Sequence, residues 1–259
     1  MWCTHRNIFL LLLLISNLLG SISCSNDNLQ KKVSTKKLNS TNLTNDTIKF
    51  DIVQIKIDTL EQKLMDANLV DIQTVDSSIL IDLKYSTINN FMKEDVYGAL
   101  NKVYLQKSVA QDLKEANQFL HQLDSTLTLL VYDGVRPRSV QQKMWDVLDL
   151  PINEKTKFVS NPKNGSIHNF GCAVDLTIAH INGTPLDMGA DFDEIGKIAY
   201  PRLEKQFLKS GELTIQQIEN RELLRKVMQH AGFYNIQTEW WHFNRYNRNK
   251  AKQMFEIIE

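Results

Sequence analysis

The stretch GSIHNFGCAVDLTI, residues 165–178, places His168 in a glycine-flanked loop and Asp175 inside an apolar segment that is typical of a buried strand. Burying a carboxylate costs several kcal/mol unless it is paired or bound to a metal. If residues 172–178 form a strand, Asp175 shares one face with the small residues Ala173 and Thr177, which suits the lining of a site. Taken alone, a strand aspartate near a loop histidine is more often a structural hydrogen-bonding pair.

A third group comes from TEWWHF, residues 238–243, where Glu239 and His242 stand three positions apart. In an ideal strand these two side chains point to opposite faces, so both reach one site only if a bulge or a strand end re-aims one of them. His168, Asp175 and His242 then form a nitrogen and oxygen donor set that suits one zinc ion with an open fourth position. Glu239 would be the base that takes a proton from water. The alternative is a surface glutamate beside a histidine bonded to a carbonyl.

An arginine lies in the loop YDGVRP, residues 132–137, directly after a buried strand. Pro137 restricts the chain beyond Arg136. A guanidinium here could stabilise the oxyanion that forms when water attacks a carbonyl. It could equally pair with a surface carboxylate. We expect His180, in a turn past the strand, to be structural.

The hydrophobic pattern predicts an α+β fold, a single compact domain with a central, mainly antiparallel sheet flanked by helices and the zinc site at the sheet. Helix-capping patterns appear at Ser139 with Gln142 and at Thr214 with Gln217, and Gly232 would stop the second of these helices. The predicted strands cover residues 69–75, 78–85, 127–134, 172–178 and 234–243, and the predicted helices cover residues 105–123, 140–148 and the segment between Thr214 and Gly232.

Composition excludes several classes of protein. The chain has 259 residues, a formal net charge of +0 and 42% hydrophobic residues, which fits one globular domain at residues 48–259. The sequence contains no stripe of basic residues, so we do not expect nucleic acid as a partner. Three scattered cysteines are too few for a disulfide framework or a thiolate zinc site. No pattern indicates an oligomeric state.

The N-terminus predicts export. Arg6 precedes an apolar run at residues 8–15, which is short for a membrane span of about 20 residues but typical of a signal peptide at residues 1–23. The SISC ending resembles a bacterial lipobox, so Cys24 could be lipidated and attach the protein to a membrane; plain secretion is the alternative. Residues 24–47 are polar and predict a tether. We therefore expect the periplasm or cell envelope.

The motifs SIHNFGCAVDLT, EWWHF and YDGVRP, with DLKYSTINNF earlier in the chain, resemble the zinc D-alanyl-D-alanine dipeptidases of the vancomycin-resistance type. The resemblance covers about residues 70–250, and Cys172 and Val135 depart from the family pattern outside any chemical role. It implies zinc binding by His168, Asp175 and His242, with Glu239 as the catalytic base and Arg136 polarising the scissile carbonyl. It further implies a dipeptide site near the substrate's amino group made by Tyr85, Ser166 and Asp193.

The expected function is therefore zinc-dependent hydrolysis of D-Ala-D-Ala or similar small dipeptides with free termini, in cell-wall peptide turnover. An exported form would salvage dipeptide or trim wall fragments. One alternative is a zinc D,D-carboxypeptidase or endopeptidase acting on peptidoglycan stem peptides. The other is a zinc-bearing binding protein without catalysis, against which the presence of both Glu239 and Arg136 argues.

Overall fold

The structure is a computed structural model and describes residues 59–156 and 159–259. The predicted signal peptide, Cys24, the predicted tether and residues 48–58 of the predicted domain lie outside the described residues. Within the described part of the chain, none of the helices has both the length and the apolar character needed to cross a bilayer.

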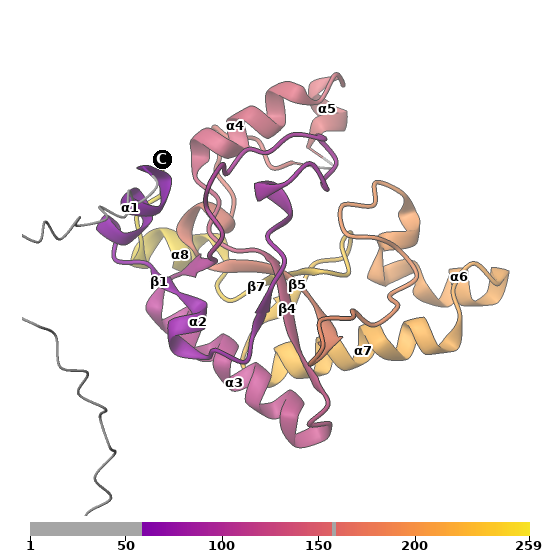
Figure 1. The fold of residues 1–259 in the computed structure, drawn as a ribbon. Helices are drawn as coiled ribbons and strands as arrows, with labels where there is room; N and C mark the ends of the chain where they lie inside the picture. The colour runs from indigo at the N-terminus through magenta and orange to yellow at the C-terminus, as the bar shows by residue number, and fades with distance from the viewer. Residues whose placement is uncertain (1–58, 157–158) are drawn as a thin grey trace, which may run out of the picture. The chain divides into compact units, whose positions relative to one another are not determined.

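A five-stranded sheet forms the centre of the fold (Figure 1). Its strands, in spatial order, are β2 (Leu80–Ile81), β4 (Leu127–Asp133), β5 (Ala173–His180), β7 (His242–Asn244) and β6 (Tyr234–Asn235). Only β2 and β4 run parallel; the other neighbours are antiparallel. A separate antiparallel pair joins β1 (Val70–Asp71) to β3 (Tyr104–Leu105). The expected α+β fold with a mainly antiparallel sheet is confirmed.

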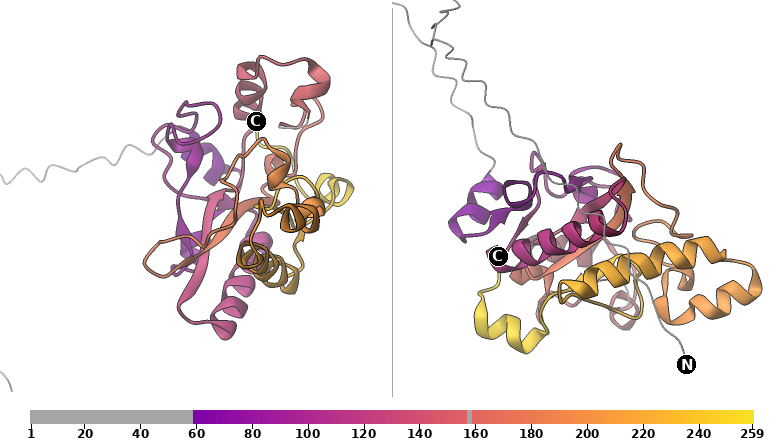
Figure 2. Two further views of the ribbon diagram at one scale, coloured as in Figure 1. Left: turned by 90° about the vertical axis from the view of Figure 1, so that its right-hand side faces the viewer. Right: turned by 90° about the horizontal axis from the view of Figure 1, so that it is seen from below.

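Two long helices, α3 (Lys107–Leu123) and α7 (Ile215–His230), pack against each other and against the sheet (Figure 2). In α3 the buried residues recur at helical spacing, as the sequence predicts. The predicted capping box of α7 is present between Thr214 and Gln217. The other helices are α1 (Thr59–Asp66), α2 (Ile72–Val75), α4 (Arg138–Val147), α5 (Ile152–Lys155), α6 (Glu204–Ser210) and α8 (Arg248–Met254), with 3₁₀ turns η1 (Lys84–Ser86), η2 (His168–Phe170), η3 (Lys197–Ala199) and η4 (Pro201–Leu203).

The core lies along the two central strands. Every residue of β4 is buried, and β5 is buried except for its last residue, His180. The central strands therefore form a rigid support on which polar groups can be positioned.

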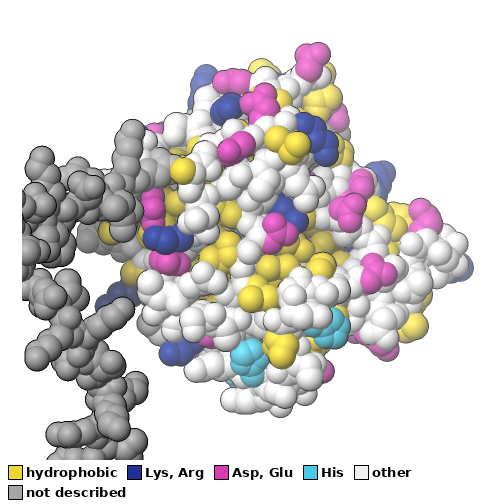
Figure 3. Space-filling model, viewed as in Figure 1, with side chains coloured by type: hydrophobic (Ala, Val, Ile, Leu, Met, Phe, Trp, Pro, Cys, Tyr) yellow, Lys and Arg dark blue, Asp and Glu magenta, His cyan; other side chains and the backbone are white. Residues whose placement is uncertain are grey.

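On the surface seen in Figure 3, acidic and basic side chains are interspersed around smaller apolar areas.

Three of the predicted elements are wrong in extent. The strand expected at residues 69–75 ends after Asp71, because the Asp71 carboxylate accepts a hydrogen bond from the amide of Gln73 and caps α2. The strand expected at residues 78–85 is limited to β2, and the chain then turns through η1. The helix expected at residues 140–148 begins at Arg138 after Pro137, so Ser139 lies inside its first turn and does not cap it.

The strand expected at residues 234–243 is instead a hairpin. Tyr234 pairs with Asn244 and Asn235 with Phe243, and the residues between them form the connecting loop. The Trp240 indole N–H donates to the carbonyl of Ala190 at 3.1 Å, which ties this loop to the segment after β5. Aromatic residues are typical of a strand, but here Trp240 and Trp241 lie in a loop and their rings are nevertheless buried.

Candidate active site

Three neighbouring strands place polar side chains in one row across the sheet. Asp133 of β4 lies opposite Asp175 of β5, and Asp175 lies opposite His242 of β7. An irregularity between Val131 and Asp133 shifts the register at the end of β4. His168 joins the row from η2, the 3₁₀ turn that leads into β5. Residues far apart in sequence therefore meet at one edge of a rigid sheet.

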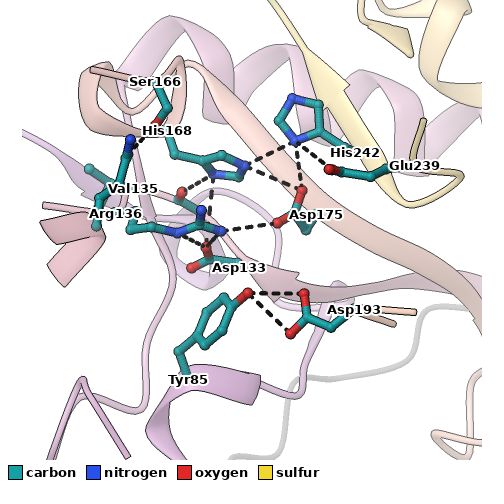
Figure 4. Close-up of polar contacts among 12 residues, drawn as sticks. Tyr85, Asp133, Val135, Arg136, Ser166, His168, Asp175, Asp193, Glu239 and His242 are labelled. Atoms are coloured by element: carbon teal, nitrogen blue, oxygen red, sulfur yellow. Dashed lines mark hydrogen bonds and ion pairs between the residues drawn. The ribbon is translucent and has the colours of Figure 1, made fainter. Parts of the chain in front are cut away.

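The two histidines and Asp175 converge on one point (Figure 4). His168 Nε2 lies 3.1 Å from His242 Nδ1 and 3.3 Å from Asp175 Oδ1, and His242 Nδ1 lies 2.9 Å from Asp175 Oδ1. The three donor atoms, His168 Nε2, Asp175 Oδ1 and His242 Nδ1, thus form a nearly equilateral triangle, which we call the metal-ligand triangle. A metal ion could be held by all three at once, which is the set that the sequence predicts.

The far nitrogen of each histidine is engaged by an acceptor. His168 Nδ1 donates to the carbonyl of Gly134 at 2.6 Å, and His242 Nε2 donates to the Asn244 side-chain oxygen at 3.0 Å. Since these acceptors carry no proton, they place the imidazole protons on the outer nitrogens. The lone pairs of His168 Nε2 and His242 Nδ1 then face the centre of the triangle, as in metal sites whose ligands are oriented by outer hydrogen bonds.

The electrostatics keep Asp175 ionised. Burial acts to raise the pKa of Asp175, but the neighbouring His168 and His242 outweigh it and hold that pKa well below its usual range. Burial acts to lower the pKa of His242, yet the neighbouring carboxylate of Asp175 raises that pKa overall. The site therefore presents an anionic oxygen beside two nitrogen donors, a chemistry that attracts a cation.

Glu239 lies in the hairpin loop, before β7 begins. Its Oε2 is 3.9 Å from His242 Nδ1, and its side chain is 24% exposed. Residues three apart therefore reach one site because Glu239 precedes the strand, in agreement with the requirement for a strand end. Burial raises the pKa of Glu239 to about 7, with the negative charge of Asp175 acting in the same direction. Such a carboxylate can exchange a proton near neutral pH.

Arg136 is clamped by two carboxylates. Its Nε and Nη2 donate to Asp133 Oδ2 at 2.9 and 2.6 Å, and Nη2 also reaches Asp175 Oδ2 at 3.4 Å. Asp133 is fully buried and accepts a further hydrogen bond from the Tyr97 hydroxyl at 2.8 Å. The guanidinium is therefore fixed beside the metal-ligand triangle, and among the described residues its Nη1 has no hydrogen-bond partner.

The three expected substrate-binding residues make different hydrogen bonds. The Tyr85 hydroxyl donates to Asp193 Oδ1 and Oδ2 at 3.0 and 3.1 Å, so these two residues do lie together. Ser166 instead donates from its hydroxyl to Gln141 Oε1 at 2.7 Å. In Figure 4 Ser166 is drawn apart from the Tyr85–Asp193 pair. All three residues nevertheless line the same cavity, so their joint role in binding a substrate stays a prediction.

A cavity of about 260 Å³ connects these groups. It lies just below the roughly 300–1,000 Å³ that is usual for drug-sized ligands, which favours a small ligand. No residue of α3 or α7 is among the described residues that line it, so the two long helices do not contribute to its wall. The predicted site residues all line it: Tyr85, Arg136, Ser166, His168, Asp175, Asp193, Glu239 and His242.

Sequence reasoning missed the groups that orient the site. Asp133, Tyr97 and Asn244 hold Arg136 and His242 in place. For Asp133 a signal was present, since it is a carboxylate that ends a wholly buried strand, as unusual there as Asp175 in its own strand. Tyr97 and Asn244 carry no such signal, because a tyrosine in a loop and an asparagine at the end of a strand are common.

Comparison with known proteins finds similar chains among D-alanyl-D-alanine dipeptidases. The family model described as D-ala-D-ala dipeptidase, Peptidase_M15, matches residues 65–259. A D-alanyl-D-alanine dipeptidase of Escherichia coli (strain K12) is 31% identical over 163 residues, which are 63% of this chain and 77% of the relative. One from Enterococcus faecalis is 29% identical over 177 residues, 62% of this chain and 83% of the relative. A solved structure of the vancomycin-resistance D,D-pentapeptidase VanY with Zn(II) is 16% identical, with a TM-score of 0.36, over 69% of this chain and 92% of that one.

Proposed function

The chain belongs to the Peptidase_M15 family of D-Ala-D-Ala dipeptidases, and on that premise we propose that this metallopeptidase uses zinc to hydrolyse D-Ala-D-Ala and similar small dipeptides with free termini. Its role would be in cell-wall peptide turnover. The observation that carries the proposal is the triangle of His168, Asp175 and His242 with the Glu239 carboxylate 3.9 Å away in one small cavity.

The donor set fits zinc. Two imidazole nitrogens and one carboxylate oxygen are usual for catalytic zinc sites, which leave the fourth position open. Tetrahedral zinc with ligands at about 2.0–2.2 Å separates neighbouring ligand atoms by about 3.3–3.6 Å. The separations of 2.9–3.3 Å among His168, Asp175 and His242 approach these values. When bound, zinc supplies a Lewis acid that polarises a carbonyl and lowers the pKa of a water molecule towards about 7.

The protein's own groups then have distinct roles. Glu239 accepts a proton from the attacking water and passes it to the leaving amine, a task for which a pKa of about 7 is suited. Arg136, held by Asp133, presents Nη1 to the oxygen of the carbonyl as that oxygen becomes negative. Because Asp133 fixes the guanidinium in advance, little reorganisation is needed when the charge develops.

The amino end of the dipeptide is assigned to Asp193. Burial raises the pKa of Asp193 to about 7, with the charge of Asp175 adding to the effect. A substrate ammonium placed here would return Asp193 to its ionised form by direct pairing. The Tyr85 hydroxyl holds both carboxylate oxygens and so sets the direction of the pair.

A substrate panel tests the proposal. We expect wild-type protein to hydrolyse D-Ala-D-Ala and to cleave N-acetyl-D-Ala-D-Ala and a pentapeptide stem at least about tenfold less efficiently, since the acetylated and longer substrates lack an ammonium for Asp193. Asp193→Asn should lower kcat/KM for the free dipeptide by about 10–100-fold and leave the acetylated dipeptide nearly unchanged. Steady-state kinetics over the same range of concentrations for each substrate give the ratios of kcat/KM between substrates and between variants.

Asp191→Asn is the matched control, because Asp191 lies in the same loop but is exposed and does not line the site cavity. Efficient cleavage of the acetylated dipeptide or of the pentapeptide would favour the D,D-carboxypeptidase function instead. Protein that binds zinc but cleaves none of the three would favour a binding protein.

We also propose that the protein is exported and anchored through Cys24. The support is the apolar run at residues 8–15 after Arg6 and the SISC ending, all outside the described residues. A single acyl chain binds membranes only marginally, so stable anchoring requires the several chains of a bacterial lipoprotein. Export would give the enzyme access to peptides released from the wall.

Replacing the cysteine tests the anchor. Wild-type protein expressed with its leader should partition into detergent and incorporate labelled fatty acid, and Cys24→Ser should abolish both or block processing. Cys3→Ser is the matched control, since Cys3 lies upstream within the predicted signal peptide and should change neither result. Wild-type protein that is fully soluble and lacks residues beyond position 24 would contradict the anchor.

A further inference from the structure

Arg248, the first residue of α8, lines the same cavity and has no role in the chemistry described so far. The residue is partly buried, and its Nη1 donates to the backbone carbonyls of Asn164 and Gly165 at 2.6 and 2.8 Å. These two hydrogen bonds use one nitrogen only. Among residues 59–156 and 159–259, no partner occupies Nε or Nη2, and no carboxylate lies within ion-pair distance.

The other charges of the cavity make this arginine unusual. Four carboxylates line the cavity, those of Asp175, Asp193, Glu194 and Glu239. Two arginines line it as well, and Arg136 is already paired with Asp133 and Asp175. Within the described part of the chain, Arg248 is therefore the cationic group of this cavity that lacks an acidic partner. A partly buried cation of this kind is favourable where an anion binds.

The position of Arg248 is fixed relative to the metal ligands. Its hydrogen bond to Gly165 places it beside Ser166, two residues before His168. Figure 4 draws Ser166 apart from Tyr85 and Asp193. Asp193 and Arg248 line the same cavity as His168, Asp175 and His242, so an acidic and a basic side chain are both available to one small ligand that also reaches the metal ligands.

We propose that Arg248 binds the C-terminal carboxylate of the dipeptide and thereby makes a free C-terminus a requirement of the enzyme. The inference rests on the proposed function and adds a specificity-determining residue to it. The Nε and Nη2 edge of a guanidinium presents two parallel N–H donors, which match the two oxygens of a carboxylate. The hydrogen bonds of Nη1 to the Asn164 and Gly165 carbonyls hold that edge in a constant direction.

The same hydrogen bonds also allow a purely structural role, in which Arg248 only fixes the loop that leads to Ser166 and His168. The two roles differ in which substrate they affect. A lost carboxylate contact weakens only substrates that carry a carboxylate, whereas a displaced loop weakens every substrate and the metal site with it. Comparing D-Ala-D-Ala with D-Ala-D-alaninamide separates them, because the amide keeps the ammonium and the scissile bond and lacks only the terminal charge.

The experiment measures binding and turnover in parallel. In the metal-loaded Glu239→Gln variant, calorimetric titration gives Kd for the dipeptide and for its amide; in protein with Glu239 intact, kinetics give KM and kcat. Adding Arg248→Gln should raise Kd and KM for D-Ala-D-Ala by about 10–100-fold, with kcat and the values for the amide little changed. Arg248→Lys should recover part of the loss, because it keeps the charge without the paired donors.

Lys250→Gln is the matched control. It removes the same charge from the same helix, but Lys250 is exposed and stacks over Tyr246 away from the cavity lining. Equal losses for dipeptide and amide in Arg248→Gln, or loss of bound metal, would assign Arg248 to the loop alone and overturn the inference. Unchanged affinity for both would overturn it as well. Wild-type protein that binds the dipeptide in an Arg248-dependent way without hydrolysing it would refute the proposed function and leave the inference standing.

Discussion

Removal of the metal should abolish hydrolysis of D-Ala-D-Ala while leaving the fold in place. Lewis-acid catalysis supplies several kcal/mol of transition-state stabilisation, which is a loss on the order of 10³-fold or more in rate. His242→Ala should have the same effect, because it removes one of the three ligands in the metal-ligand triangle and leaves only Asp175 and His168 to bind the metal. Metal content by atomic emission and initial rates with and without chelator measure both quantities.

The fold is expected to survive because the site lies at the end of the sheet, whereas the core is formed by β4 and β5 with α3 and α7. The circular dichroism spectrum should therefore change little. The free energy of unfolding should fall only by the amount that metal binding contributed, with a corresponding decrease in melting temperature. His180→Ala is the matched control, since His180 ends the same strand β5 but is exposed. Full activity in metal-free protein, or metal retained at full occupancy by His242→Ala, would contradict the assignment.

The second large effect is expected at Glu239. Glu239→Gln keeps the size of the side chain and removes only its ability to accept a proton. General-base catalysis contributes typically about 10²–10⁴-fold, so kcat should fall by at least that factor. Metal content should remain that of the wild type, because the Glu239 carboxylate lies 3.9 Å from His242 Nδ1 and outside the donor triangle.

Glu194→Gln is the matched control for Glu239→Gln. Glu194 lines the same cavity, but its carboxylate accepts from the amide of Gly196 and has no contact with a metal ligand among the described residues. Its substitution should change kcat by less than about threefold, within the range of ordinary surface changes. If Glu239→Gln retained wild-type kcat, or if it lost its metal, Glu239 would be a structural residue rather than the base.

The local parts of the fold follow from the sequence. The apolar spacing of α3, the capping box at Thr214 and Gln217, and the apolar runs of β4 and β5 each depend on residues close together in the chain. Such periodic patterns identify an element whatever it packs against. The failures occur where local chemistry is ambiguous, as in the aromatic segment before His242, which has strand composition but forms a hairpin loop.

The candidate site divides in the same way. The metal ligands and Glu239 can be named from the sequence only when their motifs are taken together and compared with a family, because a single buried carboxylate or histidine needs a partner but does not show which one. The side-by-side pairing of Asp175 with His242, 67 residues apart, depends on the register of β5 and β7. The contact between Tyr85 and Asp193, 108 residues apart, depends on the folding of two loops.

By itself the sequence determined the residue types of the site and the two central strands β4 and β5, because these follow from hydrophobic periodicity and the cost of burying charge. Only the tertiary structure decided which of those residues meet. It placed Asp133 as the partner of Arg136, paired the Ser166 hydroxyl with Gln141, and brought Arg248 to the cavity. The physical reason is that strand register and loop closure depend on packing summed over the whole domain, and no short motif encodes that sum.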